Sequence, residues 1–142
     1  MNTDTENFLE SLLWADFNEK PWTIHEFHPE FIKATDDFIS GFRTYLAAKL
    51  PDTDPDDCER SFGGNVYFSL SGHGCGFWDD SDMELGKALN DALVEYSGGK
   101  YAFEQIDLMK FHGKIHLAYR TAEYRREYLA KMFNTTQQPV TA

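Results

Sequence analysis

The sequence predicts an α+β fold, a single domain over residues 1–133 in which about four helices pack on an antiparallel sheet of about four strands. Residues 29–50 place apolar side chains three and four positions apart, which is the spacing of a helix with one buried face. Strand patterns occur at residues 66–71, 101–111 and 114–119. Because hairpin-type turns join the strands, we expect the sheet to be mainly antiparallel. Residues 134–142 are expected to form a disordered tail.

Apolar periodicity and capping residues predict the helices of this domain. We expect them at residues 5–14, 29–50, 83–97 and 121–133. Thr5 is a candidate N-cap of the first helix, and Pro29 suits the first position of the second. Ser81 or Asp82 can cap the third helix, which should end at Gly98 because glycine readily adopts the left-handed conformation found after helices.

One stretch of the chain concentrates glycine, aromatic and acidic residues around a single histidine, His73. Apolar and polar side chains alternate over residues 66–71, which predicts a strand with one buried face. The glycines within residues 72–76 then allow a tight turn that displays His73. Phe77 and Trp78 follow at once, and we expect at least one of these large rings to be buried.

This stretch resembles the motif of a family of small phage-borne proteins, in which a strand leads into Gly-His-Gly-Ala-Gly-Phe-Trp-Asp. The match is local, within residues 65–82, and it carries over at Gly72, His73, Gly74, Gly76, Phe77, Trp78 and Asp79. Leu70 and Ser71 depart from the family, which has a basic residue and Asn at these positions. The family supplies no activity, so the resemblance implies a phage or mobile-element setting rather than a function.

The charge of the chain is strongly acidic and unevenly distributed. The formal net charge is −11, which argues against direct binding to nucleic acid or to an anionic membrane. Residues 1–99 hold 6 basic and 20 acidic side chains, whereas residues 100–142 hold 7 basic and 4 acidic ones. The acids gather in residues 51–59 and 79–84. They either keep the protein in solution or form a face that docks on a basic partner.

If an acidic face contacts a partner, the candidate residues come from these two clusters and the glycine-rich stretch between them. They are Asp54, Asp56, Asp57, His73, Phe77, Trp78, Asp79, Asp80 and Asp82. The acids also have local interpretations, because aspartates close turns and cap helices. The run of aspartates in residues 52–57 lacks the Gly and the terminal Glu of a calcium loop.

No residue pattern predicts a catalytic, metal or cofactor site. His73 has the chemistry of a general base or a metal ligand, but a histidine that hydrogen-bonds its own turn explains it as well. His112 and His116 are spaced as in some zinc fingers, yet on a strand they lie about 13 Å apart, too far for one ion. Cys58 and Cys75 form no Cys-x-x-Cys pair, and a disulfide between them stays open.

These observations favour a binding protein over an enzyme. The cysteine content and the absence of an apolar leader or transmembrane run predict a cytoplasmic protein, compatible with a homo-oligomer. We expect a phage or mobile-element accessory protein that binds a basic host protein, as an acidic inhibitor of a nucleic-acid-binding defence or regulatory protein. The alternative is a small-molecule-binding protein or hydrolase that uses the glycine-rich loop around His73.

Overall fold

The computed structural model describes the chain in segments and is mainly α-helical within them. The described residues are 1–16, 23–71, 74–80, 82–98, 108–111, 114–117, 129–130 and 133. The α-helices are α1 (Thr3–Asp16), α2 (Pro29–Lys49), α3 (Phe62–Ser71) and α4 (Met83–Ser97). Short 3-10 helices lie at Ile24–Glu26 and Phe77–Asp79, and the strands are β1 (Leu108–Phe111) and β2 (Lys114–Leu117).

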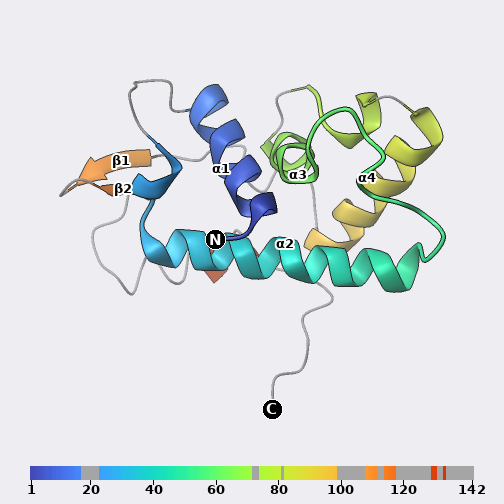
Figure 1. Ribbon diagram of the computed structural model, residues 1–142, viewed down its shortest axis with the longest axis horizontal. Helices are drawn as coiled ribbons and strands as arrows, with labels where there is room; N and C mark the ends of the chain where they lie inside the picture. Colours follow the sequence, from blue (N-terminus) through green and yellow to red (C-terminus); the bar gives the residue numbers. More distant parts are fainter. Residues whose placement is uncertain are drawn as a thin grey trace, which may run out of the picture.

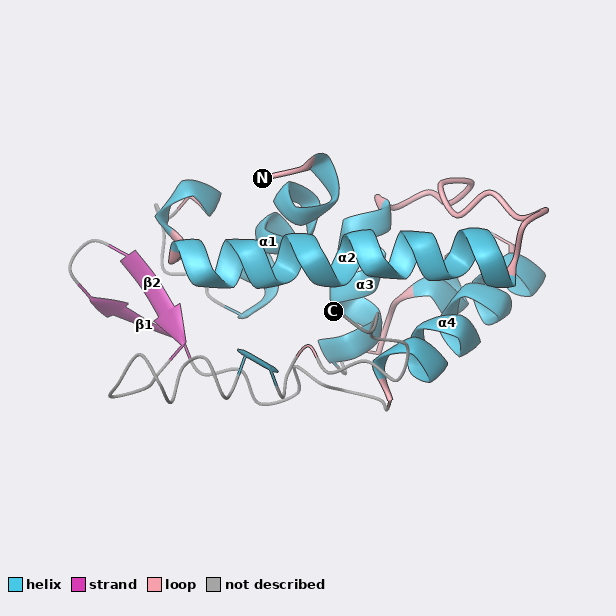
Figure 2. Cartoon of the chain, turned by 90° about the horizontal axis from the view of Figure 1, so that it is seen from below, coloured by secondary structure: helices cyan, strands magenta, loops and turns pink. Residues whose placement is uncertain are grey.

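The long helix α2 forms one edge of the molecule, and the other helices lie along one side of it. In Figure 1, α1, α3 and α4 follow one another above α2, and the β1–β2 hairpin lies beyond its N-terminal end. The same order along α2 is visible from below in Figure 2. None of the helices in the described segments combines the length and the apolar composition needed to cross a membrane.

The predicted α+β class, with a sheet of about four strands, is wrong. Residues 66–71 are helical and form most of α3, so the sheet in the described residues is the two-stranded hairpin alone. The hairpin has the predicted position, with Leu108 opposite Leu117 and Phe111 opposite Lys114. Because nearly every residue of α3 is buried, both the apolar and the polar positions of the alternating run face protein.

Helix α3 lies at the centre of the fold and packs closely against α1. Ser61 precedes it, and its Oγ accepts a hydrogen bond from the backbone N–H of Gly64 at 3.1 Å, as an N-cap does. A Cβ atom at Gly63 would overlap the backbone carbonyl oxygen of Asp4 in α1. The absence of a side chain at this position is therefore what lets the two helices approach each other.

The starts of α1 and α2 are capped by side chains that precede them. Asn2, and not the predicted Thr5, caps α1, because the Asn2 Oδ1 accepts a hydrogen bond from the Thr5 N–H at 2.8 Å. His28 caps α2 through its Nδ1, which accepts from the Glu30 N–H at 3.1 Å, and Pro29 takes the first helical position as predicted. The buried face of α2 consists of Phe31, Thr35, Phe38, Ile39, Phe42 and Leu46.

Helix α4 has the predicted extent and caps. Asp82 accepts hydrogen bonds from the N–H groups of Glu84 and Leu85, and Gly98 ends the helix with φ at 76°. The predicted helix at 121–133 and the predicted tail at 134–142 lie outside the described residues, apart from Leu129, Ala130 and Phe133. Leu129 and Phe133 are buried in the common core.

Aromatic rings join the helices into one core. The Phe42 ring of α2 lies 5.7 Å from the Phe62 ring of α3 and 5.3 Å from the Tyr96 ring of α4. The Tyr96 hydroxyl donates a hydrogen bond to the Phe38 carbonyl at 2.9 Å. Phe77 completes the group at 5.7 Å from Phe62 and is fully buried. The prediction that one ring of the Phe77–Trp78 pair is buried is thus confirmed.

Replacing Phe77 by Ala is expected to lower the free energy of unfolding by about 3–5 kcal/mol, because a fully enclosed ring leaves a cavity when it is removed. Urea unfolding followed by circular dichroism measures this loss. Met83→Ala is the matched control, since the Met83 side chain is 79% exposed. Similar midpoints for the two variants would contradict the core role of Phe77.

Candidate functional site

The described part of the glycine-rich stretch, residues 74–80, forms a folded corner after α3. The Ser69 Oγ accepts a hydrogen bond from the Phe77 N–H at 2.9 Å, and a Cβ atom at Gly76 would overlap that same oxygen. The corner is therefore built around glycine at position 76 and points the Phe77 ring into the core. Trp78 is half-buried. Gly72 and His73 lie outside the described residues.

Asp80 is the most buried of the predicted acids, and its carboxylate joins three segments. Its oxygens accept hydrogen bonds from the Glu59 N–H at 2.7 Å, the Arg60 N–H at 2.9 Å and the Asn65 Nδ2 at 2.8 Å. Burial alone would raise the pKa of Asp80. The three hydrogen bonds and the charge of Arg60 together lower it by more than burial raises it, so the pKa lies below its usual value. Asp80 is only 4% exposed, and we therefore assign it to the fold and not to a partner contact.

Arg60 extends this network from Asp80 to the surface. Its Nη1 donates to the Gly76 carbonyl and to the Asp79 Oδ1, both at 3.0 Å, and to the Asn65 Oδ1 at 3.3 Å. The hydrogen bond from Arg60 lowers the pKa of the Asp79 carboxyl. One guanidinium group thus fixes the corner after α3 against the end of the acidic loop.

The acidic loop between α2 and α3 is anchored by a second arginine, Arg43. Arg43 donates to the Asp56 carboxylate at 3.0 and 2.7 Å and also pairs with Asp4 of α1. Its guanidinium group lies 4.1 Å from the centre of the Phe62 ring. The Asp54 Oδ1 accepts from the Asp56 N–H at 2.9 Å and closes a turn.

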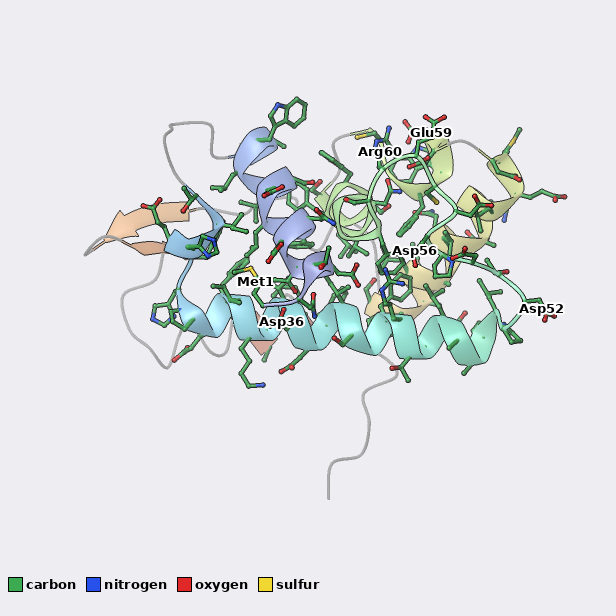
Figure 3. The ribbon with its side chains drawn as sticks, in the orientation of Figure 1. Met1, Asp36, Asp52, Asp56, Glu59 and Arg60 are labelled. Carbon is green, nitrogen blue, oxygen red and sulfur yellow. The ribbon has the colours of Figure 1, made fainter. Side chains whose placement is uncertain are left out.

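The structure therefore separates the predicted acids by their partners. Arginine, backbone or helix-cap partners bind the carboxylates of Asp56, Asp79, Asp80 and Asp82. The Asp57 carboxylate is exposed and has no hydrogen-bond partner among the described residues. Asp52 and Glu59 belong to the predicted acidic cluster of residues 51–59 but were not among its candidate contact residues. Both are exposed and have no side-chain partner among the described residues. Figure 3 shows Asp52, Asp56, Glu59 and Arg60 along this loop.

A groove of about 510 Å³ lies beside this network, and sequence reasoning missed it as well. One wall is α1, with Asn7, Glu10, Ser11 and Trp14. The other consists of Arg60, Ser61, Phe68 and Cys75. The residues on α1 are spaced by three and four positions, so the sequence did contain the signal of a second helix face.

The cysteines are free and poorly suited to nucleophilic chemistry. Burial, together with nearby carboxylates headed by Asp80, raises the pKa of Cys58 to about 11, and burial also raises the pKa of Cys75. Both thiols are consequently protonated at neutral pH. Within the described segments, no three His, Cys, Asp or Glu side chains gather as metal ligands.

Replacing Asp80 by Asn is expected to lower the free energy of unfolding by about 3 kcal/mol, because a buried, charged acceptor of several hydrogen bonds is lost. Asp57→Asn, at an exposed acid of the neighbouring loop, is the matched control. Chemical denaturation at pH 7 compares the two variants, and equal stabilities would contradict the structural role of Asp80.

We expect the free energy of unfolding to fall in acid, because three of these carboxylates have lowered pKa values in the folded protein. The pKa values of Asp56, Asp79 and Asp80 are lowered on folding, so their contribution to stability is fully present above pH 3.8, the usual pKa of an aspartate carboxyl. It is lost as pH falls from about 3.8 through the lower folded values. Denaturation midpoints measured from pH 7 to pH 2 should fall in this window, with a smaller fall for Asp80→Asn. A midpoint that does not change there would contradict the assigned pairs.

Chelation should leave the thermal stability unchanged, since Asp56 and Asp80, the carboxylates that join segments of the fold, already bind arginine and backbone N–H groups. Thermal melts with and without EDTA measure this directly. A melting temperature lowered by many degrees would instead show a structural metal.

Comparison with known proteins leaves these residues as the basis for any functional inference. No protein-family model, curated protein or solved structure matches the chain. The local resemblance of residues 65–82 to phage-borne proteins therefore stays an expectation. The features of the described chain that can contact a partner are its exposed charges, its groove and the exposed Trp14 ring.

Proposed function

We propose that this protein binds a basic partner protein through an acidic face. We define the acidic face as the exposed carboxylates of the loop before α3 and of the turn before α4, namely Asp52, Asp54, Asp56, Asp57, Glu59, Asp79, Asp82 and Glu84. The observation that carries the proposal is the contact of the Asp80 carboxylate with the Glu59 and Arg60 N–H groups. It places two acidic clusters that are distant in sequence side by side.

The charge of the face is only partly compensated by the protein itself. Arg43 pairs with Asp56, and Arg60 pairs with Asp79, which orders the face without neutralising it. Asp52, Asp57 and Glu59 have no cationic partner among the described residues. A cluster of like charges on an ordered scaffold attracts a basic surface, raises the association rate and loses this effect in salt.

The partner that fits best is a nucleic-acid-binding host protein. Such proteins present lysine and arginine in grooves that receive phosphates, and an acidic face can occupy such a groove. The local resemblance to phage-borne proteins supports an accessory role of this kind. The alternative, a small-molecule-binding protein or hydrolase that uses the glycine-rich loop around His73, stays a prediction, since His73 lies outside the described residues.

The test begins with affinity purification from the host, identification of the partner by mass spectrometry and purification of that partner. Its affinity is then measured over a salt series. The face variant carries Asp52→Asn, Asp57→Asn and Glu59→Gln. The carboxylates that it removes are exposed and have no hydrogen-bond partner among the described residues. We expect roughly tenfold weaker binding at low salt and a shallower salt dependence, because exposed charge contacts each contribute modestly.

The matched control removes the same charge elsewhere, through Asp37→Asn, Asp91→Asn and Glu95→Gln, which lie on exposed parts of α2 and α4. This variant should bind as the parent protein does. If both variants weaken binding equally, net charge alone acts and no docking face exists. If neither changes the affinity or the salt dependence, the acids serve solubility.

A further inference from the structure

The groove beside the acidic face has one wall formed by a second face of α1. Asn7, Glu10, Ser11 and Trp14 line it, three or four positions apart, whereas Phe8, Leu9 and Leu12 of the same helix are buried in the core. A helix of this kind presents one stripe to the core and another to the groove. The spacing of these residues along α1 therefore defines one wall of the groove.

Trp14 is the most unusual residue of this groove. Its side chain is 74% exposed, although an indole is among the side chains that gain most from burial. Its ring contacts the Phe68 ring of α3 edge to face, with 6.3 Å between the ring centres. An exposed tryptophan beside a groove is typical of a residue that is covered when a partner binds.

The charges around the groove favour a cation as the group that covers Trp14. Glu10 is one helical turn before Trp14 on the same face and has no hydrogen-bond or ion-pair partner among the described residues. Arg60, on the opposite wall, is already paired with Asp79 at 3.0 Å and lies 3.9 Å from Asp80. With the charge of Arg60 compensated in this way, Glu10 is the carboxylate of the groove lining that has no partner among the described residues, and the exposed Trp14 ring beside it can accept a cation.

We propose that this groove receives a lysine or arginine side chain of the basic partner, with the cation over the Trp14 ring and paired with the Glu10 carboxylate. The inference rests on the proposed function and names where its partner is anchored. Glu59 and Arg60 connect the two sites, since Arg60 lines the groove and both backbone N–H groups bind Asp80 beneath the acidic face. A basic segment lying on the face can thus reach the groove.

The probe is N-acetyl tetra-arginine amide, and the neutral control is the corresponding citrulline peptide, which has nearly the same shape without the charge. Titrations are followed by NMR through the indole N–H signal of Trp14, assigned by its loss in Trp14→Phe, and by calorimetry. We expect the arginine peptide to shift this signal and the citrulline peptide to leave it in place. Trp14→Ala should weaken binding by roughly three- to thirtyfold, and Glu10→Gln by roughly two- to fivefold.

The variants keep the two sites distinguishable. The face variant should retain the shift of the Trp14 signal, because its substitutions lie outside the groove. If the arginine peptide binds without moving that signal, or if Glu10→Gln and Trp14→Ala bind it as the parent does, the groove inference is overturned while the acidic face stands. If only the groove variants reduce binding to the purified partner, the groove is supported and the acidic face fails.

Asp37→Asn is the matched control for Glu10→Gln, as an exposed helical acid remote from the groove lining. A loss of binding to the arginine peptide in Asp37→Asn equal to that in Glu10→Gln would show nonspecific charge attraction and overturn the inference. Trp14 and Glu10 are exposed, so their variants are expected to remain folded, and the remaining amide signals of the NMR spectrum check this directly.

Discussion

The buried carboxylate of Asp80 is the interaction on which the arrangement of the central part of the chain depends. It accepts hydrogen bonds from the backbone at Glu59 and Arg60 and from the Asn65 side chain inside α3. Without it, the buried Asn65 side chain would lose the acceptor of its amide N–H, at a cost of about 1–3 kcal/mol. The position of Arg60, and through it the corner at Gly76, follows from this carboxylate.

The network that stabilises the interior also decides which acids remain available outside. Asp80 is enclosed, Asp56 and Asp79 are held by arginines, and Glu59 is displayed because its backbone is fixed by Asp80. An arginine that holds one carboxylate orders the segment around it, so the neighbouring free carboxylate has a defined position. Some of the acidic residues thus stabilise the fold, while others are exposed on the surface, and only the exposed ones can contact a partner.

The groove depends on the same central helix in another way. Gly63 lets α1 lie close to α3, and Phe68 extends from α3 to support the Trp14 ring. Because α3 is buried on nearly all sides, its position cannot change without disturbing the core. An exposed indole that rests on such a support loses little conformational freedom when a ligand covers it, which favours binding.

The sequence by itself determined the helices whose signals are local. Pro29 and the apolar spacing after it define α2, and Asp82 and Gly98 bound α4, because caps and periodicity act within a few residues. Only the tertiary structure decided α3, since its alternating pattern indicates a strand, and burial of nearly all its residues removes the difference between an inward and an outward face on which such a pattern depends. It also decided the roles of the aspartates, which are chemically identical in sequence and differ only in the donors that folding brings to them.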